Sequence, residues 1–173
     1  LNSLIDKKTI ITTEVGQNQM FAAHYLHFKH PRQFISSGGL GTMGSGFPYS
    51  IGAKVAKPDH WVADVGSEGS FLMTCQDLAT CVIEDIPVSV ILLRNHFLGM
   101  VKQWQDIFYD QRRSHTYLGD KPDFIKLADA FGAQGILVEK PSEIKPALKK
   151  AKKSDTPTIV DIVVDPHEHI LPM

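Results

Sequence analysis

Long apolar runs are absent from this sequence, and none approaches the roughly 20 residues that a membrane-spanning helix requires. Residues 1–8 also lack the basic-then-apolar order of a secretory signal. These absences predict a soluble, cytoplasmic protein that has no membrane partner.

The sequence also has few cysteines and a small net charge. The two cysteines, Cys75 and Cys81, lie in an amphipathic segment without a companion pair, which favours reduced core thiols over a metal site. The formal net charge is −1, and the 18 Lys and Arg residues are scattered, apart from residues 145–153 on an expected solvated helix face. Nothing in this distribution points to nucleic acid as a partner.

Hydrophobic residues make up 43% of the 173, which suits one globular domain, residues 1–173. Short β-branched runs alternate with longer helical patterns, and this predicts an α/β fold: a doubly wound parallel sheet with helices on both faces. Strands are expected at residues 9–14, 61–66, 88–93, 135–139 and 158–164, the last three buried on both faces. Helices are expected at residues 19–28, 44–56, 70–83, 123–131 and 142–153.

Start and stop signals support two of these helices. Asp123, after Pro122, supplies an acidic first turn, and Gly132 suits the left-handed position that follows a helix. Ser142 followed by Glu143 predicts a cap and a favourable charge for the last helix.

Two segments, residues 36–46 and 97–121, fit no regular pattern. Long irregular segments inside compact domains are usually functional, and ligands of open α/β sheets bind beyond the carboxyl ends of the strands. We expect the second segment to be mobile without a ligand, because polar side chains such as Gln103 give it little to bury.

Oxygen-bearing side chains follow two neighbouring expected strands. Residues 66–70 form a glycine-containing turn that leads into a helix and suits a phosphate, although an ordinary strand-to-helix turn also favours Gly and Ser. Glu68 lies in this turn, and Asn95 follows the next strand. A carboxylate, an amide oxygen and a main-chain carbonyl around phosphate oxygens suit octahedral Mg²⁺. Viewed alone, Asn95 is better explained as a turn former at a strand end.

This pair resembles the thiamine-diphosphate motif, which begins Gly-Asp-Gly and ends Asn-Asn. Segments across nearly the whole chain resemble the catalytic subunit of acetolactate synthase, and the tryptophan-containing segment narrows the likeness to this branch of the thiamine enzymes. They are residues 15–20, 36–44, 98–105, 108–109, 114–116, 122–128 and 171–173. The resemblance implies the thiamine-diphosphate-binding fold, with thiamine diphosphate and Mg²⁺ as cofactors.

The resemblance also implies a role for individual residues. The cofactor would be contacted by Val15, Gly16, Gln17 and Asn18 at its diphosphate end, by Gly41 and Met43 at the aminopyrimidine, by Gly69 and Ser70 as diphosphate donors, and by Leu98, Gly99 and Met100. Mg²⁺ would be bound by the side chains of Glu68 and Asn95 and by the carbonyl of Phe97, while Met100 and Trp104 would face the second ketoacid.

Three departures from the family pattern occur at the metal motif. Ser67 stands where the family has Gly, and Glu68 stands where it has Asp, so the carboxylate is one methylene longer at a site where Mg²⁺ tolerates little geometric error. Arg94 replaces the first Asn of the pair, and its charge either repels Mg²⁺ or pairs with Glu68 or the diphosphate.

The implied reaction is decarboxylation of pyruvate and its condensation with a second 2-ketoacid, in branched-chain amino acid synthesis, with thiamine as the electron sink. No catalytic residue is expected in this chain, because the family's activating glutamate lies on a pyrimidine-binding domain of a neighbouring subunit. We therefore expect an inactive isolated chain, that missing domain as a partner, and a homo-oligomer. Two alternatives stay open: half of another thiamine-dependent 2-ketoacid decarboxylase, or a noncatalytic module with an eroded metal motif.

Overall fold

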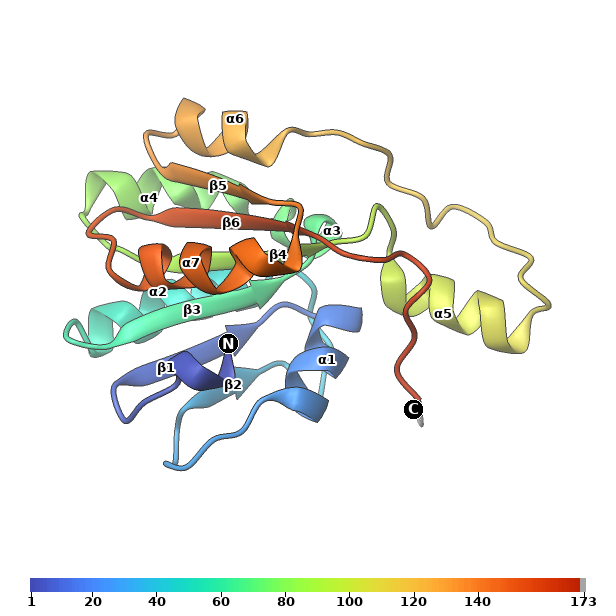
Figure 1. The fold of residues 1–173 in the computed structure, drawn as a ribbon, viewed down its shortest axis with the longest axis horizontal. Coiled ribbons are helices and arrows are strands. Elements are labelled where there is room, and N and C mark those ends of the chain that lie inside the picture. Colours follow the sequence, from blue (N-terminus) through green and yellow to red (C-terminus); the bar gives the residue numbers. More distant parts are fainter. Residues whose placement is uncertain (172–173) are drawn as a thin grey trace.

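Six parallel strands form one sheet in the computed structural model, which describes residues 1–171 (Figure 1). The strands lie in the order β2-β1-β3-β4-β6-β5. Their bounds are β1 Thr9–Thr13, β2 Phe34–Ser36, β3 Trp61–Gly66, β4 Ser89–Arg94, β5 Gln134–Val138 and β6 Thr158–Val163. Pro172 and Met173, with which the C-terminal resemblance ends, lie outside the described residues.

Helices cover both faces of the sheet, which confirms the doubly wound α/β fold (Figure 1). Their bounds are α1 Gln17–Tyr25, α2 Gly46–Ala56, α3 Glu68–Phe71, α4 Leu78–Ile83, α5 Gly99–Phe108, α6 Phe124–Ala130 and α7 Pro141–Lys152, with 3-10 turns at Asn2–Leu4 and Cys75–Asp77. On one face, α1 and α7 pack over β-branched residues of the central strands. On the other face, Phe47 of α2, Leu78 of α4 and Phe124 of α6 share a core with Cys81. Both cysteines are free, and Cys75 is partly buried beside that core.

Five strands lie within one residue of their predicted bounds, and two features of the sheet differ from expectation. β2 was not predicted, because a partly exposed strand of three residues leaves almost no pattern in the sequence. The expectation that β5 is buried on both faces is wrong. β5 is an edge strand, and Leu137 at its centre is 46% exposed.

The predicted helix over residues 70–83 is divided into α3, a 3-10 turn and α4. The chain leaves helical geometry at Thr74, whose hydroxyl donates a hydrogen bond of 3.0 Å to the carbonyl oxygen of Gly44. A tertiary contact therefore interrupts a segment that is helical by local pattern.

The boundary signals were right for α6, whereas for α7 only the favourable charge of Glu143 in the first turn is confirmed. Asp123 caps α6 by accepting from the main-chain N–H groups of its first turn, and Gly132 follows the helix with a left-handed φ of 79°. The prediction of Ser142 as a cap is wrong, because α7 begins at Pro141. Its capping carboxylate belongs to Glu143, which accepts from the N–H groups of two residues before the helix.

The starts of α1, α3 and α5 follow the carboxyl ends of β1, β3 and β4, so all three helices begin at one edge of the sheet. Among residues 1–171, no helix is long and apolar enough to cross a membrane. The edge where these helices begin is the place at which an open α/β sheet binds its ligands.

Candidate cofactor-binding site

The turn after β3 places a buried carboxylate at this edge. Glu68 opens α3 and is almost wholly inaccessible to solvent. One carboxylate oxygen, Oε1, accepts from the main-chain N–H of His96, whereas Oε2 is buried and has no hydrogen-bond partner among residues 1–171. Burial raises the pKa of Glu68, and the nearby charges of His96 and Arg94 offset only part of this rise. An unpaired buried carboxylate oxygen is costly unless a cation or a donor meets it.

The amide of Asn95 lies beside this carboxylate, at the end of β4. Its Oδ1 accepts from Phe97 N at 3.0 Å, and its Nδ2 donates to Gln17 Oε1 at 3.1 Å. His96, between Asn95 and Phe97, has a left-handed φ of 65°, which strains a non-glycine residue and shows that the loop is held by its surroundings. The side chain of Glu68 therefore meets the turn formed by Asn95, His96 and Phe97 through the N–H of His96.

This donor set fits a hard divalent cation that also binds a phosphate. The described residues contain no group of three His, Cys, Asp or Glu side chains able to hold a metal by themselves. A cation here would take its ligands from one carboxylate, one amide oxygen, a main-chain carbonyl and the oxygens of a ligand, which is how Mg²⁺ commonly binds beside phosphates. The unpartnered Oε2 of Glu68 is the observation that favours such an ion.

A cavity of about 80 Å³ opens next to this turn. Ser67 and Val101 line it together with six of the predicted cofactor residues. These six are Val15, Gly16, Met43, Leu98, Gly99 and Met100. They come from the ends of β1 and β3, the segment before α2 and the start of α5. The walls are mostly apolar, which suits the rings of an aromatic ligand rather than its phosphates.

The remaining predicted cofactor residues surround this cavity. Gln17 and Asn18 are buried in the first turn of α1, and Gly41 lies on the exposed segment that faces Val15. The N–H groups of Gly69 and Ser70 lie in the first turn of α3, where helices leave donors free.

Two glycines keep the site open. A Cβ at Gly99 would lie 2.6 Å from Gln17 Oε1, and one at Gly69 would lie 2.8 Å from Leu98 Cδ2. Both distances are shorter than real contacts, so larger residues would push the walls into the cavity.

Arg94 forms an ion pair with Asp161 and not with Glu68. Its Nε donates to both oxygens of Asp161 on β6, at 2.8 and 3.1 Å. The guanidinium is therefore committed to a buried carboxylate, and the alternative in which it pairs with Glu68 is wrong. The charge of Arg94 still lowers the pKa of Glu68, but by less than burial raises it.

Comparisons with known proteins agree with this geometry. The profile of the family "Thiamine pyrophosphate enzyme, C-terminal TPP binding domain" matches residues 14–162. The chain belongs to this family. Thiamine diphosphate is therefore the cofactor of its class, and the fold recognised from the sequence is confirmed.

Relatives within the family are acetolactate synthases. The "Probable acetolactate synthase large subunit" of Methanocaldococcus jannaschii is 53% identical over 96% of this chain. "Acetolactate synthase 1, chloroplastic" of Oryza sativa subsp. japonica and "Acetolactate synthase, chloroplastic" of Arabidopsis thaliana are 47% and 45% identical over the whole chain. The chain spans 28%, 28% and 27% of the lengths of these relatives, so it is homologous to one part of each.

The segment that the sequence left irregular, residues 97–121, contains α5; the expectation that it has little to bury is wrong for Gln103, whereas residues 107–115 are exposed. Gln103 of this thiamine-enzyme domain is fully buried and bonds to Gln17 at 2.9 Å and to both main-chain groups of Ile170. Lys102, also buried, pairs with Asp106 at 2.7 Å. Polar side chains thus anchor the helix, and its apolar side chains do not.

Trp104, a predicted substrate residue, lies on the outer side of α5. It is 48% exposed and does not line the 80 Å³ cavity, whereas its predicted companion Met100 does. Val101 and Phe108, three and four residues away on the same side, are also exposed. The structure thus places only one of the two proposed ketoacid contacts at the cavity.

Sequence reasoning missed two fully buried carboxyl groups next to the site, Glu14 and Asp64. Asp64 lies inside β3 and Glu14 follows β1 directly, and an acidic residue in or next to a buried strand was the signal that was available. Burial raises the pKa of each, and the charge of Glu14 adds to the rise at Asp64.

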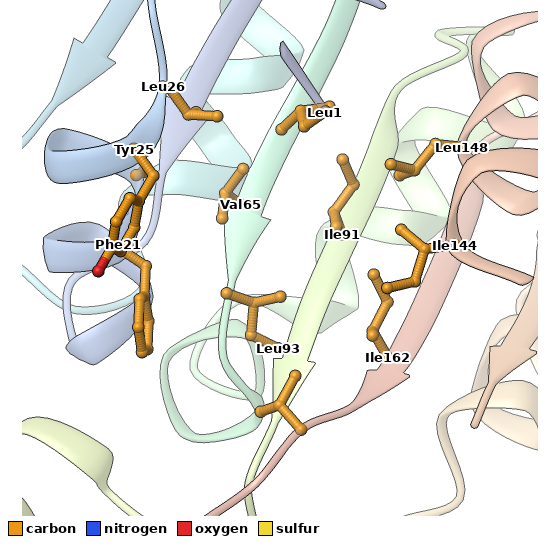
Figure 2. A pocket seen from close by; sticks show the side chains of 12 residues that line it. Leu1, Phe21, Tyr25, Leu26, Val65, Ile91, Leu93, Ile144, Leu148 and Ile162 are labelled. Carbon is orange, nitrogen blue, oxygen red and sulfur yellow. The ribbon is translucent and has the colours of Figure 1, made fainter. Parts of the chain in front are cut away.

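A second hollow, of about 240 Å³, lies on the sheet face between α1 and α7 (Figure 2). Figure 2 shows Phe21 and Tyr25 on one side, Ile144 and Leu148 on the other, and strand residues such as Ile91 between them. Its lining is aliphatic and aromatic and holds no carboxylate or amide side chain. It therefore lacks the groups that a diphosphate or a metal requires.

Proposed function

We propose that residues 1–173 are a single thiamine-diphosphate-binding domain of an acetolactate synthase-like enzyme. The complete assembly would decarboxylate pyruvate and condense it with a second 2-ketoacid in branched-chain amino acid synthesis. The unpartnered Oε2 of Glu68, buried beside Asn95 and next to a cavity lined by predicted cofactor residues, carries this proposal. When bound, thiamine diphosphate supplies the electron sink for the decarboxylation.

The chain's own residues would bind and orient the cofactor. Glu68 and Asn95, with the Phe97 carbonyl, would hold Mg²⁺, while Gly69, Ser70 and the 15–18 turn would position the diphosphate end. The apolar walls formed by Met43, Leu98 and Met100 would exclude water from the reacting rings.

The assignment of Trp104 to the second ketoacid stays a proposal. Its exposed position on α5 leaves it free to be covered when another domain closes over the site.

The rest of the assembly is proposed from the same resemblance. The activating glutamate would come from a pyrimidine-binding domain, and the protein would act as a homo-oligomer so that this domain covers the cofactor. We place it in the cytoplasm, where its two free thiols would stay reduced, although the rice and Arabidopsis relatives are named as chloroplastic.

Calorimetric titration with thiamine diphosphate, in the presence and absence of Mg²⁺, tests the proposal. We expect saturable binding that depends on Mg²⁺. Glu68→Gln keeps an oxygen for His96 N but removes the charge, so Mg²⁺-dependent affinity should fall by roughly tenfold or more. Glu84→Gln, on the exposed end of α4, is the matched control and should bind as the parent does. The absence of any saturable heat would instead favour a noncatalytic module.

A further inference from the structure

The side chain of Glu14 joins two walls of the cavity. Its own backbone continues directly into Val15 and Gly16, which line one wall. Its carboxylate Oε2 accepts from Gly44 N at 2.7 Å, and that N–H belongs to the peptide bond between Met43 and Gly44. Met43 also lines the cavity, so a single fully buried residue links two of the segments that form its walls.

The same carboxylate caps α2. Oε1 accepts from Phe47 N at 2.8 Å, in the first turn of that helix, and Gly46 N–H also contributes to holding the charge. Ser45, the residue at the cap position, makes no side-chain cap bond, because its hydroxyl donates to Thr42 O. The positive end of the helix dipole stabilises a carboxylate placed in this way.

The neighbouring buried carboxylate, Asp64, makes neither the bond to Gly44 N nor the bond to Phe47 N that Glu14 makes. A Cβ at Gly46 would lie 2.4 Å from Glu14 N, so the start of α2 approaches the end of β1 as closely as main chains can. The neighbouring Asp64 accepts from Thr12 Oγ1 at 2.9 Å, and its Oδ2 has no partner among residues 1–171. Asp64 therefore makes no hydrogen bond to the segment that carries Met43.

We propose that Glu14 is a positioning residue for the cofactor: its carboxylate fixes Met43 against the aminopyrimidine end, without touching the cofactor itself. This inference rests on the proposed function, because Met43 matters only if an aromatic ligand fills the cavity. Different parts of the protein would hold the aminopyrimidine end and the diphosphate end of the ligand. The diphosphate end would be held by α3, the metal turn and the 15–18 turn, to none of which the side chain of Glu14 makes a hydrogen bond.

The test measures the affinity of the full-length protein and its variants for two probes, thiamine diphosphate with Mg²⁺ and inorganic diphosphate with Mg²⁺. In Glu14→Gln, one of the two acceptor oxygens becomes a donor that faces an N–H group. We expect affinity for thiamine diphosphate to fall by about tenfold or more, with affinity for inorganic diphosphate within about twofold of the parent. Equal weakening of both probes would show a merely structural role and would overturn the inference.

A matched control is available at α7, where Glu143 also accepts from two main-chain N–H groups at a helix start and does not line the cavity. Glu143→Gln should change the affinity for neither probe. A double-mutant cycle adds a second criterion, because Glu14→Gln should have little further effect in a Met43→Ala background if it acts through Met43. Full additivity would contradict the proposal.

If Glu14→Gln does not fold, Met43→Ala tests the contact on which the inference depends, since it leaves the bonds of Glu14 to the main chain in place. Selective loss of thiamine diphosphate binding supports the inference, and unchanged selectivity overturns it. A parent protein that binds inorganic diphosphate with Mg²⁺ but gains nothing from the thiamine rings overturns the inference alone. A parent that binds neither probe removes the proposed function as well.

Discussion

Replacing Arg94 by Asn, the residue that the thiamine-diphosphate motif would place there, should destabilise this protein. The guanidinium donates to both oxygens of Asp161, and the two side chains are only 18% and 3% exposed. Removal of one partner leaves a buried carboxylate without its cation, which costs roughly 3–5 kcal/mol. For a domain of this length, that corresponds to a fall in melting temperature of roughly 6–20 °C.

Urea unfolding followed by circular dichroism measures this cost. The double variant Arg94→Asn with Asp161→Asn should recover most of the loss, because the unpaired charge is removed with its partner. Arg112→Asn is the control, since its pair with Asp110 is 3.9 Å long and largely exposed, and its loss should cost about 0.5 kcal/mol or less. A stability of Arg94→Asn within about 0.5 kcal/mol of the parent would refute the reasoning.

Three further predictions concern buried polar groups and glycines. Burial and the charge of Glu14 raise the pKa of Asp64, so the folded state keeps a proton that the unfolded chain releases. The stability of the fold therefore falls as pH rises above the unfolded pKa of Asp64. Asp64→Asn should raise the melting temperature at pH 8, and this gain should shrink toward pH 4. Gln103→Ala should loosen α5 and increase acrylamide quenching of Trp104 fluorescence, and unchanged quenching would mean that the helix is held by other contacts. Gly99→Ala should abolish cofactor binding because its Cβ meets buried amides, whereas Gly52→Ala on α2, with open space around it, should stabilise the fold by about 0.5–1 kcal/mol in thermal melts.

The sequence predicted most of the sheet because its strands are short and strongly apolar. β3 is buried along its whole length, and its predicted bounds equal those observed. The edge strands gave weaker signals: β2 is too short to show a pattern, and β5 reads as buried although one side of it faces solvent. Whether a strand is central or at an edge depends on the order of strands in space, which periodicity does not encode.

Some residues of the candidate site could likewise be predicted from the sequence, and others could not. Residues next to recognisable motifs, such as Glu68 and Asn95, could be predicted because the motif itself brings strand ends together. The pair between Arg94 and Asp161 joins positions 67 residues apart, and nothing local marks it. In α5 the apolar residues that recur at helical spacing, Val101, Trp104 and Phe108, are exposed, whereas Lys102 and Gln103 are buried through an ion pair and hydrogen bonds, so its packed face is polar and was not predicted.

The strand order has a consequence for how the protein is made. β6 lies between β4 and β5, so β5 has no neighbour in the sheet until the later strand has been synthesised. On a ribosome, β1 to β4 can pair as they emerge, whereas β5 and its helix α6 wait with apolar residues uncovered. Strand pairings that close only after a long segment of chain are slow and expose such intermediates to aggregation. The last strand of the sheet therefore completes it from within, and newly made chains are most vulnerable just before β6 inserts.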